Sequence, residues 1–174
     1  MKLHAKYRNK KQGHKTTNPI IFSVYIGYFA GILWGGVKLL EFAMKFTEVV
    51  PGFLLEPFFR HSFLIAWQGL ALGYASFVGL SVLAAAIYGM FLRKLKGPWP
   101  GIGYGLAWWC VLYLLVGPLT EMVPAITQLD LNSFVTDLCL FMVWGLFIGF
   151  SIAMEFTEER IREPGGRAKT PALK

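Results

Sequence analysis

SFLIAWQGLALGYASFVGLSVLAAAIYGMFL, residues 62–92, is a run of 31 residues without a single charge. A membrane-crossing helix needs about 20 mostly apolar residues to bridge about 30 Å of hydrocarbon. At about 1.5 Å per residue, a helix of this length would reach about 46 Å. We therefore expect it to tilt, protrude or kink. Polar and apolar residues do not alternate along the run, which favours a helix over a barrel strand.

Three further stretches have the same character, at about residues 20–40, 102–119 and 134–154. A backbone in lipid must satisfy its own hydrogen bonds, so each stretch is expected to be helical. Of the 174 residues, 55% are hydrophobic and 16% are charged, whereas a soluble domain carries about 25% charged residues. The sequence therefore predicts an all-α, polytopic membrane protein, with four transmembrane helices packed as a bundle over residues 19–156.

Lysine and arginine gather on one side of the predicted bundle. The N-terminal region, the connector between the second and third spans and the C-terminal region together carry 14 of them, and the opposite side carries three. Because short cytoplasmic segments are enriched in these residues, we expect both termini in the cytoplasm. Residues 1–18 are expected to be a disordered basic arm and residues 157–174 a polar cytoplasmic tail.

The same basic excess, 17 Lys and Arg against 10 Asp and Glu, bears on partners. Beside the bilayer itself, it favours anionic lipid headgroups at the cytoplasmic face. Nucleic-acid binding needs a basic face on a folded module. No stretch of this chain is long enough to build one, so no nucleic-acid partner is predicted.

Small residues recur at intervals of four in three of the spans. The glycines concerned are Gly27, Gly31 and Gly35 in the first span, Gly69 and Gly73 in the second, and Gly145 and Gly149 in the fourth. Helices in lipid associate by close approach at small residues. We expect these glycines to pack the helices of a monomeric bundle. The alternative is that one groove forms a homo-oligomer or binds a partner membrane protein.

Ionisable residues in or beside a membrane span are costly and are functional candidates by default. Lys38 and Glu41 share one helix face near the end of the first span, where a lysine side chain can reach water. We interpret them as a structural pair. His61, Glu121 and Asp137 lie at the same outer level, within an acidic rim that we interpret as a solvated surface. The alternative is that these five residues form a proton or cation path.

Two apolar segments at the ends of the spans have other interpretations. VVPGFLLEPFF, residues 49–59, contains two prolines and is too short to cross. It lies in the outer interface, re-enters the membrane under a cover of protein, or is an ordinary connector. Aromatic side chains crowd the start of the third span: Trp99, Tyr104, Trp108 and Trp109. Such residues typically mark the membrane–water interface, so we interpret them as anchors.

Enzyme signatures are absent from the sequence. It has no Walker loop, nucleophile elbow or HExxH motif, and two cysteines are too few for a tetrathiolate metal site. We predict no catalytic residue, metal site or cofactor. The first hypothesis is a non-enzymatic accessory, assembly or scaffold component. The alternative is a small proton- or cation-linked transporter or channel, and the third is a lipid-acting enzyme that uses His61.

Three segments in order carry a resemblance to a known family: GYFAGILWGGVKLLEF (27–42), EPFFRHSF (56–63) and RKLKGPWPGIGYGLAWW (93–109). Over about residues 15–160 the chain resembles the YqhR family of conserved membrane proteins from Bacillus-type Firmicutes. The resemblance implies a four-helix protein in the bacterial cytoplasmic membrane of a Gram-positive cell. It implies no activity and carries over no functional residue. A fainter similarity, in the glycines before Lys38 and the acid after it, points to an enterobacterial inner-membrane family linked to acid resistance.

Overall fold

The computed structural model describes residues 18–95, 97–120 and 130–162. Within these residues, four helical stretches are long and apolar enough to cross a membrane. They are Pro19–Ala43, Trp67–Phe91, Trp99–Thr120 and Leu131–Phe156. The prediction of an all-α protein with four membrane-crossing helices is confirmed.

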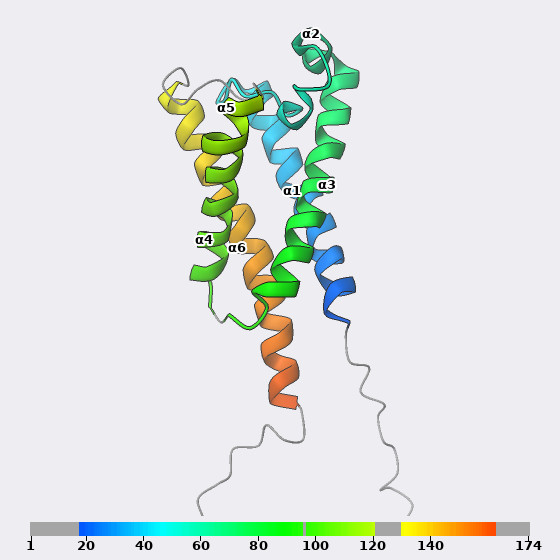
Figure 1. Cartoon of the computed structure of the whole chain (residues 1–174), viewed down its shortest axis with the longest axis vertical. Helices are drawn as coiled ribbons and strands as arrows, with labels where there is room; N and C mark the ends of the chain where they lie inside the picture. Colours follow the sequence, from blue (N-terminus) through cyan, green and yellow to red (C-terminus); the bar gives the residue numbers. More distant parts are fainter. Residues whose placement is uncertain (1–17, 96, 121–129, 163–174) are drawn as a thin grey trace, which may run out of the picture.

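The helices have the following bounds: α1 Pro19–Ala43, η1 Phe53–Leu55, α2 His61–Ile65, α3 Trp67–Phe91, α4 Trp99–Trp109, η2 Cys110–Val116, α5 Gly117–Thr120 and α6 Leu131–Arg162. α1 begins and α6 ends at the same end of the bundle, the lower end in Figure 1, which we name the terminal end. η1, α2 and α5 lie at the opposite end, which we name the η1 end.

The long uncharged run is two helices rather than one. Ala66 has an extended backbone (φ −67°, ψ 157°), which ends α2 and allows α3 to begin at Trp67. α2 folds against the first turn of α3, so closely that a Cβ added at Gly69 would lie 2.2 Å from the carbonyl oxygen of Phe63. The membrane-crossing part of the run is therefore shorter than the 31 residues suggest.

The third span is continuous but not uniform. α4 runs into η2, a π-helical segment, and then into the short α5. Pro118 lies just beyond η2 and lacks the N–H that would bond to the fourth residue before it. A proline is a recognised cause of local distortion in a helix, and π-helical turns are frequent at functional sites. One residue of η2, Tyr113, takes part in the polar site described below.

Glycine seams join the spans in two pairs. α1 packs on α3, where Cβ atoms added at Gly27 and Gly31 would lie 2.7 Å and 2.6 Å from backbone atoms of α3. Gly35 of α1 faces the ring of Tyr74, which also belongs to α3. Only residues without a side chain allow backbones to approach so closely.

The second seam joins α4 to α6. Gly145 and Gly149 of α6 lie against the backbone of Gly101 and Gly105 of α4, with added Cβ atoms 2.4 Å and 2.5 Å from glycine Cα atoms. The two α4 glycines have the same four-residue spacing, although the sequence interpretation did not include them among the packing glycines. Gly73 is different, because it packs on Gly52 in the segment before η1 and not on a long helix.

Aromatic side chains fill the space between the two helix pairs. Phe77 of α3 contacts Phe141 and Trp144 of α6, with ring centroids 6.2 Å apart in both cases. The indole N–H of Trp144 donates to Ser81 Oγ at 3.0 Å, which satisfies a buried donor. Trp109, expected to be an interface anchor, is 3% exposed and stacks on Tyr113 in this core. The anchor interpretation is therefore wrong for Trp109, whereas Trp99 is 79% exposed.

Candidate functional site: a buried ion pair at the η1 end

Lys38 of α1 and Asp137 of α6 form an ion pair inside the bundle. Their side chains are 1% and 0% exposed. The Lys38 ammonium donates a hydrogen bond to Asp137 Oδ1. Because α1 belongs to one glycine-packed pair and α6 to the other, this ion pair joins the two halves of the bundle near the η1 end.

The second oxygen of Asp137 is also satisfied. The Tyr113 hydroxyl donates to Oδ2 at 2.8 Å, and Thr47 Oγ1 donates to it at 3.1 Å. Thr47 Oγ1 in turn accepts a hydrogen bond from the backbone N–H of Val49 at 3.1 Å. A carboxylate taken from water into an apolar interior requires such compensation. Asp137 is therefore held by one cation and two hydroxyl donors.

The chain between α1 and α2 covers this cluster. Val49, Val50 and Phe53 are buried, and the Phe53 ring lies 5.9 Å from that of Tyr113. The same segment is tied to the start of α6, because the Glu48 N–H donates to Ser133 Oγ at 2.9 Å. Residues 49–53 thus pack into the bundle, whereas Phe58 is 78% exposed.

Glu41 lies one helical turn beyond Lys38 and is half-buried. Its carboxylate interacts electrostatically with both Lys38 and Asp137. Its Oε2 atom is buried and has no hydrogen-bond partner among the residues that the structure describes. The cluster thus contains one cation and two carboxylates, and only one of these carboxylates has both oxygens compensated.

Three of the five predicted path residues come together here, but not as expected. The expected pairing of Lys38 with Glu41 is wrong, since Lys38 pairs with Asp137, 99 residues away along the chain. Lys38 does not extend to water, and Asp137 does not belong to a solvated rim, because both side chains are buried. Lys38 and Glu41 do share one face of α1, but the partner of Lys38 is on α6.

Of the other two candidates, His61 lies outside the cluster. His61 Nδ1 lies 2.7 Å from Glu56 Oε1, and the His61 side chain is 62% exposed. This surface pair does not include the buried carboxylates. Glu121 lies outside the described residues. Within the described part of the chain, no three His, Cys, Asp or Glu residues are grouped as a metal site would require.

Two residues of the cluster, Thr47 and Tyr113, were missed from the sequence. Thr47 stands in a polar connector where nothing distinguishes it from its neighbours. Tyr113 did leave a signal: it is a hydroxyl-bearing residue deep in an otherwise apolar span, and buried tyrosine hydroxyls usually find a polar partner. That signal predicts a partner but not which one.

Comparisons with known proteins agree with the fold. The family model described as "Conserved membrane protein YqhR" matches residues 4–165. The uncharacterized protein YqhR of Bacillus subtilis (strain 168) is 29% identical over 154 residues, which cover 87% of this chain and 86% of the relative. No solved structure matches the chain significantly.

Proposed function

Since the chain belongs to the YqhR family of conserved membrane proteins, we propose that it is a small proton-linked transporter or channel in which Glu41 exchanges the proton. The observation that carries the proposal is the buried Oε2 of Glu41, which has no hydrogen-bond partner in the described structure and lies beside the Lys38–Asp137 ion pair. An ionisable group in such a position is costly to maintain in a membrane span.

The surroundings of Glu41 suit proton exchange. Glu41 lies two residues before the end of α1 at Ala43, so protons from the aqueous phase at the η1 end have only a short distance to travel to it. Lys38 places a positive charge, and Asp137 a negative charge, close enough to interact with the Glu41 carboxylate. A change in the protonation of Glu41 therefore changes the electrostatic balance at the ion pair that joins the two helix pairs.

The proposal includes an orientation. The η1 end faces the outside of the cell membrane, and both termini face the cytoplasm. Support comes from the three regions rich in Lys and Arg, which hold 14 such residues and adjoin helix ends at the terminal end in Figure 1. Positive residues favour the cytoplasmic side.

An accessory, assembly or scaffold role is the second candidate. It is favoured by the complete hydrogen bonding of Asp137, whose two oxygens accept from three donors. A carboxylate whose two oxygens are both hydrogen-bonded can link helices structurally without any change in its protonation. Transport requires Glu41 to exchange a proton, whereas the accessory role does not.

Proton uptake into liposomes tests the proposal. The full chain is purified in mild detergent and reconstituted with a pH-sensitive dye inside the vesicles, and a potassium diffusion potential drives proton entry. We expect the wild-type protein to conduct protons faster than empty liposomes, and Glu41→Gln to reduce the rate to that of empty liposomes. Glutamine keeps the size of the side chain but cannot exchange a proton.

Glu48→Gln is the matched control, because Glu48 is an exposed carboxylate seven residues further along the chain, in the connector that follows α1. It should conduct at the wild-type rate. Thermal unfolding of both variants in detergent should match that of the wild type, since neither carboxylate is a partner in the ion pair. A wild-type rate equal to that of empty liposomes would refute transport and leave the accessory role, whereas a conducting Glu41→Gln variant would refute proton exchange at Glu41.

A further inference from the structure

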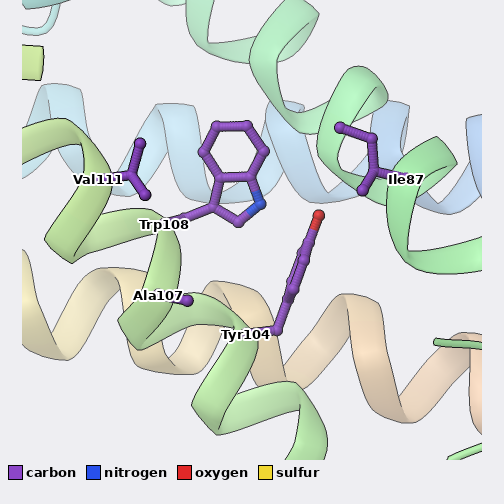
Figure 2. Close-up of a pocket in the computed structure, with 5 residues that line it drawn as sticks. All are labelled: Ile87, Tyr104, Ala107, Trp108 and Val111. Atoms are coloured by element: carbon purple, nitrogen blue, oxygen red, sulfur yellow. The ribbon is translucent and has the colours of Figure 1, made fainter. Parts of the chain in front are cut away.

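A groove opens between α3 and α4, on the side of the bundle where no glycine seam draws the helices together. Its lining residues are Ile87 of α3 and Tyr104, Ala107, Trp108 and Val111 of α4 and η2. Its volume is about 200 Å³, and the walls are apolar throughout. Figure 2 shows the rings of Tyr104 and Trp108 projecting from α4 towards α3.

The groove is held open by side chains. The Tyr104 hydroxyl donates to the carbonyl oxygen of Ala84 at 2.8 Å, and the Tyr104 ring meets the Tyr88 ring edge-on at 5.0 Å. Through these contacts, the Tyr104 side chain acts as the spacer between α4 and α3. Because the hydroxyl of Tyr104 is already bonded to α3, it offers no free polar group, and the space suits only hydrocarbon.

Basic residues flank one end of the groove. Ile87 lies four residues before the end of α3 at Phe91, a rise of about 6 Å, and Arg93 and Lys94 follow directly in the connector to α4. The Arg93 guanidinium lies 5.9 Å from the centre of the Phe156 ring, and Lys94 is exposed. Positive charge therefore lies beyond the groove at the terminal end, in the connector that follows the helix of Ile87.

We propose that this groove is a binding site for an anionic phospholipid, with one acyl chain between Ile87 and Trp108 and the phosphate at Arg93 and Lys94. The combination of apolar walls at membrane depth with cations at the end of the same two helices matches the chemistry of such a molecule. A helix from a partner protein is about 10 Å across with its side chains and is too wide to enter between α3 and α4 where the Tyr104 hydroxyl bonds to Ala84.

Quenching of tryptophan fluorescence tests the site. The full chain in mild detergent is titrated with phosphatidylglycerol that carries bromine on an acyl chain, and separately with phosphatidylcholine brominated in the same way. The signal of Trp108 is obtained by subtracting the titration of a Trp108→Phe variant. We expect half-maximal quenching of Trp108 at a lower concentration of phosphatidylglycerol than of phosphatidylcholine.

Two variants separate the groove from the charges. Ala107 is exposed in the groove wall, so Ala107→Phe should fill the space and remove most of the Trp108 quenching by either lipid. Leu115→Phe is its control, because Leu115 is 60% exposed on the same span and does not line the groove. It should leave the quenching unchanged.

Arg93→Gln with Lys94→Gln should weaken phosphatidylglycerol binding by about fivefold for each residue and leave phosphatidylcholine unaffected. These two residues lie outside the helices, so this variant tests the proposal even if Ala107→Phe fails to fold. Equal quenching by the two lipids in the wild type would overturn the proposal. Unchanged quenching in a folded Ala107→Phe variant would overturn it as well.

Discussion

At the scale of single residues, the Lys38–Asp137 pair should dominate the stability of the bundle. Removal of one partner leaves the other as an uncompensated buried charge, which costs about 3–5 kcal/mol. We expect Asp137→Leu to lower the free energy of unfolding by this amount, because Lys38 is 1% exposed and would lose its carboxylate. Unfolding by sodium dodecyl sulfate in mixed micelles measures the loss.

The double variant Lys38→Met with Asp137→Leu is the matching control. It leaves no stranded charge, and apolar replacement of a buried ion pair is often nearly neutral. The double variant should therefore unfold at a higher detergent fraction than Asp137→Leu alone. Lys38→Met alone completes the comparison. If the double variant loses as much free energy of unfolding as the two single variants together, the two side chains are not coupled, and the pair does not stabilise the protein as the geometry implies.

The Lys38–Asp137 pair also shows what can and cannot be predicted from the sequence for single residues. The positions of Lys38, Glu41 and Asp137 near span ends predict that they matter, because charges near lipid are costly. Spacing along one helix shows which side chains share a face, and so it suggested Glu41 as the partner of Lys38. The actual partner lies on α6. Which helices adjoin is a property of the packed bundle, and a helix's own periodicity does not contain it.

At the scale of elements, the glycine seams can be tested with the smallest possible change. A Cβ added at Gly31 would lie 2.6 Å from Val78 Cα, whereas one added at Gly36 would meet nothing within 4 Å. Gly31→Ala should therefore push α1 away from α3 and destabilise the protein. Gly36→Ala should be neutral or stabilise α1 by up to about 1 kcal/mol, because alanine is the better helix former.

Thermal unfolding of both alanine variants in the same detergent makes the comparison. The two substitutions are chemically identical and five residues apart on one helix, so a difference between them isolates the contact with α3. Equal melting temperatures for the two variants would show that α1 and α3 do not approach as closely as the structure has them.

The elements themselves were predictable where the signal is local. Apolar length gave four helices, and four-residue glycine spacing indicated close packing. The break at Ala66 was not predictable in position, since neither glycine nor proline stands at that residue. It depends on α2 packing against Gly69, a contact that exists only once both helices have formed. The same holds for residues 49–53, whose burial depends on Gly73 of α3.

At the scale of the whole molecule, the structure is two glycine-packed helix pairs joined by aromatic side chains and one ion pair. The sequence predicted the number of spans, but not that α1 pairs with α3 and α4 with α6, nor that a groove separates α3 from α4. Each seam joins spans that follow one another in the chain, and the ion pair joins α1 to α6 across the middle. Glu41 interacts with both members of that ion pair, so the proposed proton exchange would act at one of the contacts that join the two helix pairs.

The proposed orientation, with both termini in the cytoplasm, rests on the distribution of charge and is open to direct measurement. Lys45 at the η1 end and Lys94 at the terminal end are both exposed. In a background with Cys110→Ser and Cys139→Ser, a Lys45→Cys variant should react with a membrane-impermeant maleimide on intact bacteria. A Lys94→Cys variant should react only after the cells are opened, because the sequence segments that carry 14 of the 17 basic residues precede or follow helix ends at the terminal end, and such segments favour the cytoplasmic side. The reverse pattern would place the Lys38–Asp137 cluster near the cytoplasm, and protons would then reach Glu41 from inside the cell.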